Sequence, residues 1–429
     1  MASAARRGEH GWLLRLLYET SRIVLENGRA KKLVTNMETI MNRPVDSLKG
    51  WISLVLCHCS GLIDLVAMPV WIGIVLIGMY GLSPQSAGAL VSCFLGAAVI
   101  SSAIVSPRAD RIRGARAVPL GYGVAAAAFI AMATTRDYNA MILLHLVGGL
   151  GVGVGLSMAH ATMGASSNPH RLIAVAFLAL TMVSLGFLGG VSKLVVAYGG
   201  PVLFLALGCI MLVTALFALI GFPSRRSGAS HLDAPVQHGK LRRVVWFAMI
   251  GTSFALLNHS MMFGFVERVG DAHGFSRAQL MNTMLAIGLV NLSPGILATF
   301  FEKKISPKVV IVFGPALHAM LCLMLTQTTV FGVYTVGACL FPVVMTFTHT
   351  FIFAYLARLD PSGRAVAATP VMLMTGSAIG PFLGGAVAQH FGYESLGWVV
   401  VALAAVSVGF FLAVVRGESR ETSGVPKAA

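Results

Sequence analysis

Residues 51–80 read WISLVLCHCSGLIDLVAMPVWIGIVLIGMY, an apolar run whose single charged residue is Asp64. A helix rises about 1.5 Å per residue, so this run is long enough to cross the roughly 30 Å hydrocarbon core of a bilayer. Backbone groups in lipid have no water to bind, and a helix satisfies their hydrogen bonds internally. The stretch therefore predicts a transmembrane helix, with length to spare for tilting or for extending beyond the bilayer.

The rest of the chain repeats this composition. Hydrophobic residues make up 56% of the 429 residues and charged residues only 11%, and the mean hydropathy is +0.81. A soluble domain carries about a quarter charged residues, so lipid must solvate much of this protein. Membrane-spanning strands would be about ten residues long, whereas these segments have the length of helices. We predict twelve spans, at residues 51–80, 88–106, 117–134, 140–163, 172–194, 201–222, 244–266, 279–300, 309–326, 331–355, 366–388 and 396–415.

The positive charges indicate the orientation of these spans. The net charge is +15, which in a soluble protein would suggest a nucleic-acid partner, but in a membrane protein the distribution matters more. With twelve spans, 27 of the 31 Lys and Arg residues fall on the side that holds both termini. Cytoplasmic loops carry such an excess. The sequence predicts a multi-pass protein of the plasma membrane, a bacterial inner membrane, with both termini in the cytoplasm and no nucleic-acid partner.

Weak internal similarity suggests two related halves. Trp51 and Trp246 open the first and seventh segments, and Phe187-Leu-Gly-Gly190 in the fifth recurs as Phe382-Leu-Gly-Gly385 in the eleventh. Such repeats are typical of secondary transporters. The predicted organisation is a cytoplasmic segment with an amphipathic helix (1–50), a six-helix bundle (51–222), a cytoplasmic central loop (223–243), a second six-helix bundle (244–416) and a cytoplasmic tail (417–429).

The loop after the second segment carries a recognisable motif. It reads Ser106-Pro-Arg-Ala-Asp110-Arg111-Ile-Arg113-Gly114-Ala-Arg116 and resembles the G-x-x-x-D-R-x-G-R-[RK] loop of the major facilitator superfamily. The resemblance extends over roughly residues 50–416 and implies an all-α fold of two pseudo-symmetric six-helix bundles. It also implies that Asp110, Arg111, Arg113 and Arg116 form a conformational latch, in which charge-assisted hydrogen bonds favour one closed state. The alternative is a solvated basic loop.

Two glycine-rich stretches resemble further motifs of the family. His145 begins His145-Leu-Val-Gly-Gly149, where the family often has R-x-x-x-G, and unlike Arg a His titrates near neutral pH. The alternative for His145 is an interfacial position near the outer end of its helix. The eleventh segment fits the G-x-x-x-G-P-x-x-G-G pattern that antiporters carry in their fifth span. We interpret its residues as helix-packing positions, because glycines permit close approach and proline bends a helix: Gly376, Gly380, Pro381, Gly384 and Gly385.

Ionisable residues inside a bilayer are costly and therefore suggest function. Asp64 is the only acidic residue deep in a predicted span, thirteen residues after Trp51, and His259 stands at the same offset from Trp246. The resemblance implies that the first and seventh helices line a central cavity, so both side chains are expected to face it. We predict that Asp64 couples transport to protons, with His259 as its partner. Alternatively, Asp64 only bonds a neighbouring helix and His259 binds substrate or packs. Four residues are candidates for substrate contacts: His58, His145, Asn258 and Asn291.

Several functions are excluded by what the sequence lacks. No phosphate-binding loop, protease motif or metal-ligand spacing is present, and the six cysteines all fall in apolar segments. We therefore expect no enzyme activity, no cofactor and no metal. The partners expected are a small-molecule substrate, protons and the bilayer, and the protein is predicted to be monomeric.

The predicted function is secondary active transport of a small hydrophobic or amphipathic organic compound, coupled to protons. The alternatives are a proton symporter of organic or aromatic acids, an uncoupled facilitator, or, from another class, a membrane sensor or a channel. A sensor would need a sizeable soluble domain, for which only residues 1–50 are available.

Overall fold

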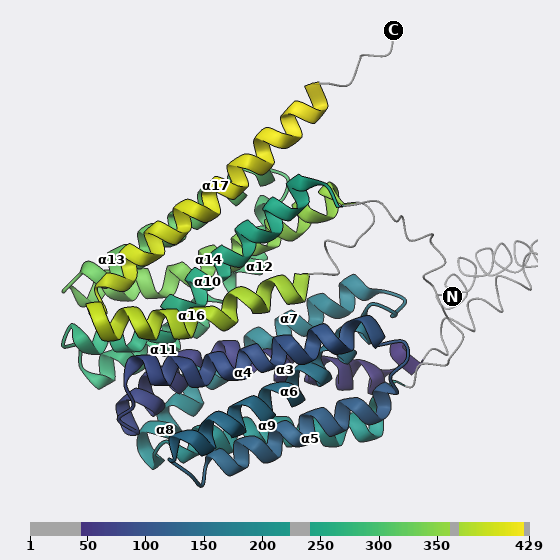
Figure 1. Cartoon of the computed structure of the whole chain (residues 1–429), viewed down its shortest axis with the longest axis vertical. Coiled ribbons are helices and arrows are strands. Elements are labelled where there is room, and N and C mark those ends of the chain that lie inside the picture. Colours follow the sequence, from purple (N-terminus) through teal and green to yellow (C-terminus); the bar gives the residue numbers. More distant parts are fainter. Residues whose placement is uncertain (1–43, 224–240, 361–368, 424–429) are drawn as a thin grey trace, which may run out of the picture.

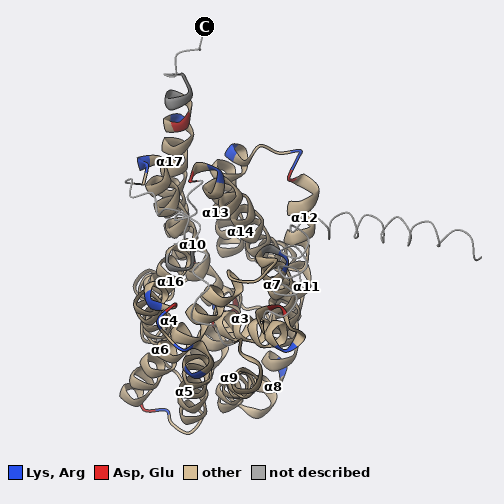
Figure 2. Ribbon diagram, turned by 90° about the vertical axis from the view of Figure 1, so that its right-hand side faces the viewer, with Lys and Arg blue, Asp and Glu red and all other residues tan. Residues whose placement is uncertain are grey.

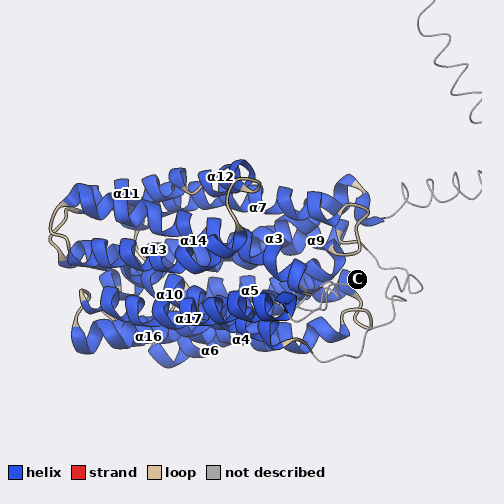
Figure 3. Cartoon of the chain, turned by 90° about the horizontal axis from the view of Figure 1, so that it is seen from above, coloured by secondary structure: helices blue, strands red, loops and turns tan. Residues whose placement is uncertain are grey.

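The computed structural model describes residues 44–223, 241–360 and 369–423. This part of the chain is helical and contains no strand (Figure 3). Eleven of its helical spans are long and apolar enough to cross a membrane, and α16 adds a further 23-residue helix. The prediction of an all-α polytopic membrane protein is confirmed. The predicted amphipathic helix within residues 1–50 and most of the central loop lie outside the described residues.

The first half of the described chain contributes six spans. They are α3 (Leu48–Met68) with its π-helical continuation η2 (Pro69–Met79), α4 (Pro84–Val105), α5 (Gly114–Met132), α6 (Tyr138–Met163), α7 (Pro169–Gly186) with η4 (Phe187–Val191) and α8 (Ser192–Tyr198), and α9 (Pro201–Gly221). Short 3-10 turns, η1 (Pro44–Asp46) and η3 (Ser106–Arg108), precede α3 and follow α4.

The second half contributes the other spans. They are α10 (Arg243–Ala272), α11 (Arg277–Val290) with α12 (Ser293–Phe301), α13 (Pro307–Gln327), α14 (Phe331–Leu359), α16 (Thr369–Phe391) and α17 (Ser395–Ser423). Helices α3 to α9 lie together in Figure 1, α10 to α17 lie beside them, and α4 and α16 run side by side between the two groups.

Helix-capping residues fix where several helices begin. The side chain of Ser83 accepts a hydrogen bond from the Ser86 N–H at the start of α4, and Asp137 does the same for α6. Ser276 and Gln279 form a reciprocal capping box at the start of α11. All three caps lie at one end of the bundle, which we call the far end. The opposite end, where α3 begins and α17 finishes, is called the terminal end.

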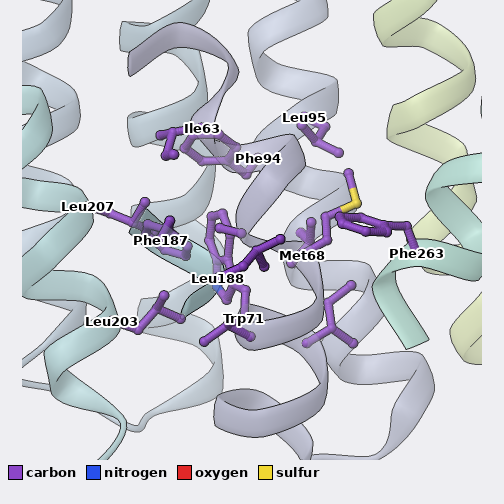
Figure 4. Packing of buried hydrophobic residues seen from close by; sticks show 14 of the residues in the cluster. Ile63, Met68, Trp71, Phe94, Leu95, Phe187, Leu188, Leu203, Leu207 and Phe263 are labelled. Carbon is purple, nitrogen blue, oxygen red and sulfur yellow. The ribbon is translucent and has the colours of Figure 1, made fainter. Parts of the chain in front are cut away.

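Large aromatic side chains fill the centre of the first half. Trp71 is fully buried, and its ring centroid lies 5.4 Å from that of Phe94 and 5.5 Å from that of Phe129. Figure 4 shows Trp71 and Phe94 in this packing, and it also places Phe263 of α10 beside Met68 of the first span. Charged residues occur mostly at turns and helix ends, as Figure 2 shows, and few of them lie in the packed interior of the described residues.

Candidate functional site

The first span changes its helix type shortly after Asp64. Pro69 has no N–H to donate and begins η2, an eleven-residue π-helix in which Tyr80 N donates to Val75 O at 2.9 Å. π-Helical segments are rare and frequently accompany functional sites. The change therefore marks the region around Asp64 and Pro69 as one in which the helix geometry departs from the most stable form.

Asp64 lies in the interior with an incomplete set of partners. Its side chain is 1% exposed, and Oδ1 accepts a hydrogen bond from the Leu65 N–H at 2.9 Å. Oδ2 is buried without a hydrogen-bond partner, and no Lys, Arg or His pairs with this carboxylate among the described residues. Tyr122 of α5 also packs against α3, where its hydroxyl donates a hydrogen bond to the Cys57 carbonyl oxygen.

The structure does not bring Asp64 and His259 together as the sequence suggested. His259 Nδ1 has no hydrogen-bond partner, and its ring stacks on Phe263 with centroids 5.4 Å apart and contacts Phe341 at 5.7 Å. No hydrogen bond or ion pair joins His259 to Asp64 within the described parts of the chain. The two positions are equivalent by sequence offset, but each side chain is packed into its own half.

His259 belongs instead to a cluster of three histidines. The His318 ring of α13 lies 5.7 Å from that of His259 and 5.6 Å from that of Phe341. His349 of α14 lies near both of these histidines, and its Nε2 has no hydrogen-bond partner. The sequence did not predict this cluster, because helix spacing does not show which faces of three separate helices meet.

A second histidine pair lies in the first half. His58 of α3 is 2% exposed, and its Nδ1 lies 3.0 Å from Nε2 of His160 in α6. One of these two nitrogens must carry the proton of the hydrogen bond, so the tautomer of one ring determines the tautomer of the other. Phe177 packs edge-on against His58 at 4.8 Å. His58 thus links α3, α6 and α7.

Of the remaining substrate candidates, two are buried and one lies at a helix end. His145 is fully buried rather than interfacial; its Nδ1 lies 2.6 Å from the Met141 carbonyl oxygen, and its ring lies 5.3 Å from Trp71. Asn258 is buried, and its Nδ2 donates to the Val400 carbonyl oxygen at 3.2 Å. Asn291 caps the end of α11, where the eighth span breaks before α12. The described residues contain no group of three or more His, Cys, Asp or Glu arranged to hold a metal ion.

The motif glycines of α16 lie against two neighbouring helices. A Cβ on Gly376 or Gly380 would overlap atoms of α10, and a Cβ on Gly384 would lie 2.8 Å from the Met261 side chain of that helix. Gly385 faces the other way, toward the Pro84 carbonyl oxygen of α4. Helix α16 is therefore packed against α10 of its own half and α4 of the other half.

The contact between α4 and α16 closes the far end of the interface between the halves. The Phe382 N–H donates to the Ser92 hydroxyl at 3.0 Å, and the Gln85 N–H donates to the Gln389 side chain at 3.2 Å. These hydrogen bonds accompany the close approach of the two backbones. The two halves are therefore in direct backbone contact along this part of α4 and α16.

A charged cluster completes the closure on the other side of the far end. A Cβ on Gly73 of η2 would lie 2.6 Å from Oε2 of Glu267 in α10, and Glu267 is 7% exposed. Arg268 Nε lies 3.2 Å from the same oxygen, and Arg268 also pairs with Asp271. A polar cavity of about 260 Å³ adjoins these charges and is also lined by Arg277. Glu267 was missed because the predicted span stopped at residue 266, whereas α10 continues to Ala272.

The latch residues at the terminal end make no such contacts. Asp110 is exposed and has no hydrogen bond or ion pair within the described residues. Arg113 occupies the N-cap position of α5 without a capping side-chain bond, and Arg111 and Arg116 are exposed. The latch stays a prediction, and in this conformation its aspartate is not engaged.

Known proteins share the family and the fold of this chain. A family model described as the Major Facilitator Superfamily matches residues 54–369. A bacterial homologue of the human lysosomal transporter Spinster, in an inward-facing and occupied conformation, is similar with a TM-score of 0.66 and 14% identity, over 85% of this chain and 96% of that one. Its inward-facing and unoccupied conformation gives a TM-score of 0.64 and 13% identity over the same shares. No curated protein matches the sequence.

The family model covers most of the chain, and the solved structures share its helical arrangement across both halves. The resemblance to this family is therefore confirmed. The chain belongs to the major facilitator superfamily and is a multi-pass membrane transporter.

Proposed function

We propose that this protein is a proton-coupled secondary transporter that moves a small hydrophobic or amphipathic organic compound by alternating access. The observation that carries the proposal is the environment of Asp64, which is buried in the first span with Oδ2 lacking any hydrogen-bond partner. An oxygen with no partner is available to take a proton. An ionisable group kept inside a bilayer despite its cost is the kind of residue that transporters use for coupling.

The second element of the proposal is the conformational state. We propose that the terminal end is cytoplasmic, because the predicted twelve-span topology assigns 27 of the 31 Lys and Arg residues to the side of the membrane that holds the termini. The far end would then face outward, and its closure by α4, α16, η2 and α10 corresponds to an inward-facing conformation. The unengaged Asp110 supports the same assignment, since a cytoplasmic latch would be released while the inner end is open. The similar bacterial structures are themselves described as inward-facing.

The substrate class is inferred from the residues of the second half. His259 lies between the aromatic rings of Phe263 and Phe341, and the ion pairs described within α10 are all at its far end. No Lys or Arg side chain contacts Asp64 or His259 within the described residues. A site that holds a carboxylate would usually present an Arg to it. The chemistry favours an apolar or amphipathic solute over an organic acid.

The proposal is tested with purified protein in liposomes that contain a pH-sensitive dye. A panel of lipophilic cations and aromatic acids is added in turn, and both solute uptake and internal pH are recorded. We expect lipophilic compounds to be transported with a simultaneous pH change. Uptake without a pH change would identify an uncoupled facilitator, and coupled uptake of aromatic acids alone would support the acid symporter. A sensor would depend on residues 1–50, whereas a transporter would not. We therefore expect a chain that lacks residues 1–45 to transport the solute still.

A further inference from the structure

The second half also has a surface groove that lies away from Asp64 and from the contacts at the far end. An apolar groove of about 640 Å³ runs between α12, α13 and α14 on the second half. Thr348 is the only polar residue in its lining. The groove is open on the outer surface of the bundle, since Phe313 is 65% exposed and Met320 is 58% exposed. In a membrane this surface faces the lipid.

The sequence of α13 explains why a groove forms here. A Cβ on Gly314 would overlap the side chain of Thr348, so α13 and α14 approach closely at this point. Ala316, also in the lining, adds little bulk. Large side chains stand on either side of these small residues. The principal walls are Phe301, Ile305, Phe313, Leu317 and Phe347.

The length of the groove matches one leaflet of a bilayer. Along α13 its lining runs from Val309 near the terminal end to Met320, which is about 16 Å at the helical rise. The hydrocarbon core of a bilayer is about 30 Å thick, so one leaflet is about 15 Å deep. The groove therefore spans the leaflet on the terminal side and stops near the middle of the membrane.

Basic residues stand at the mouth of the groove. Lys303 and Lys304 lie in the turn between α12 and α13, and both are exposed. Lys304 Nζ lies 3.3 Å from the ring centroid of Phe300, and that ring packs against Phe301 of the groove wall at 5.0 Å. Glu302 is the acidic residue of the same turn.

A third lysine in this region already forms an ion pair with a carboxylate. Lys308 at the start of α13 pairs with Glu418 of α17 at 2.7 Å. The charge available to a ligand at the mouth is therefore that of Lys303 and Lys304, opposed by Glu302. The mouth is positive, and the groove behind it is apolar.

We propose that this groove binds an anionic phospholipid of the cytoplasmic leaflet, with one acyl chain between α13 and α14 and the phosphate at Lys303 and Lys304. Lipid tails are as apolar as the groove, so apolar contact alone gives little selectivity. Selectivity comes from the headgroup, because each lysine near an anionic membrane surface strengthens binding about fivefold. The inference uses the proposed orientation of the protein but not its coupling to protons.

Lipid retention tests the proposal without any transport assay. The full-length protein is purified with phosphatidylglycerol and phosphatidylcholine of identical acyl chains in equal amounts, and bound lipids are counted by native mass spectrometry. For wild type we expect phosphatidylglycerol to be retained in about 25-fold excess over phosphatidylcholine, from two lysines at about fivefold each. In the double variant K303Q/K304Q the ratio of bound phosphatidylglycerol to bound phosphatidylcholine should fall to about one. Both lysines are exposed, so this variant should fold normally.

A second pair of variants tests the groove itself. Ala316→Trp fills the groove and should remove the retained phosphatidylglycerol. Ile220→Trp is the matched control, because Ile220 is 80% exposed on α9 and lies outside the groove. Equal retention of the two lipids by wild type would overturn the proposal. Retention by Ala316→Trp equal to that of Ile220→Trp would also overturn it, since the bound lipid would then lie elsewhere.

Discussion

A methyl group on Gly88 of α4 would overlap the carbonyl oxygen of Pro381 in α16. This relationship joins the two halves of the transporter at the far end. It requires a hydrogen atom in place of a side chain at residue 88, because the obstacle is backbone and cannot rotate away. The glycine therefore permits the closed far end, and alternating access requires this contact to separate in the opposite state.

The first prediction concerns this contact. Gly88→Val should push α4 and α16 apart and shift the population toward a conformation that is open at the far end. Spin labels at Thr134 and Phe391, on a background without reactive cysteines, would report the distance across that end. The distance should lengthen in Gly88→Val. Gly96→Val on the same helix is the control, because no atom lies within 4 Å of a Cβ there. An unchanged distance in Gly88→Val would contradict the role given to Gly88.

The second prediction concerns the charges of α10. Arg268→Gln leaves Glu267 buried against η2 without its paired arginine, and it should lower the free energy of unfolding by about 3–5 kcal/mol. Glu267→Gln should cost less, because Arg268 keeps Asp271. The double variant Glu267→Gln with Arg268→Gln should recover most of the loss. A thiol-reactive dye can follow unfolding, since Cys57 and Cys322 are buried. A double variant less stable than Arg268→Gln would argue against this pairing.

The third prediction concerns the two histidines in the first half. A double-mutant cycle on His58→Ala and His160→Ala should give a coupling energy of about 0.6 kcal/mol, the average for a hydrogen bond between membrane helices. The same unfolding assay measures it. The control cycle combines His58→Ala with His318→Ala in the other half, and those effects should add. A coupling energy of zero between His58 and His160 would mean that their hydrogen bond contributes nothing to stability.

The spans could be predicted from sequence because apolar length determines them. The predicted segment 201–222 agrees with α9 to within one residue at its end. The seventh span was predicted too short, because Glu267 and Arg268 interrupt the apolar pattern. The structure continues the helix through both residues, since each is the other's counter-charge. Hydropathy contains no information on that pairing.

The contacts within the candidate site could be predicted only in part. The cost of charge in lipid singled out Asp64, and the structure buries it. The equal offsets of Asp64 and His259 from a tryptophan suggested that they meet, but an offset fixes depth along a helix and not the face that a side chain occupies. His259 therefore contacts His318. The break of the eighth span at Asn291 has a local signal in the Ser293-Pro pair that opens α12.

Separating exchange from net transport tests the role of Asp64 most directly. In liposomes, exchange of labelled for unlabelled substrate needs no net proton movement, whereas net uptake driven by a pH gradient does. We predict that Asp64→Asn retains exchange and loses gradient-driven uptake, whereas Asp64→Glu keeps part of both. If Asp64→Asn still accumulates substrate in response to the pH gradient as wild type does, Asp64 does not couple transport to protons and the central claim is wrong.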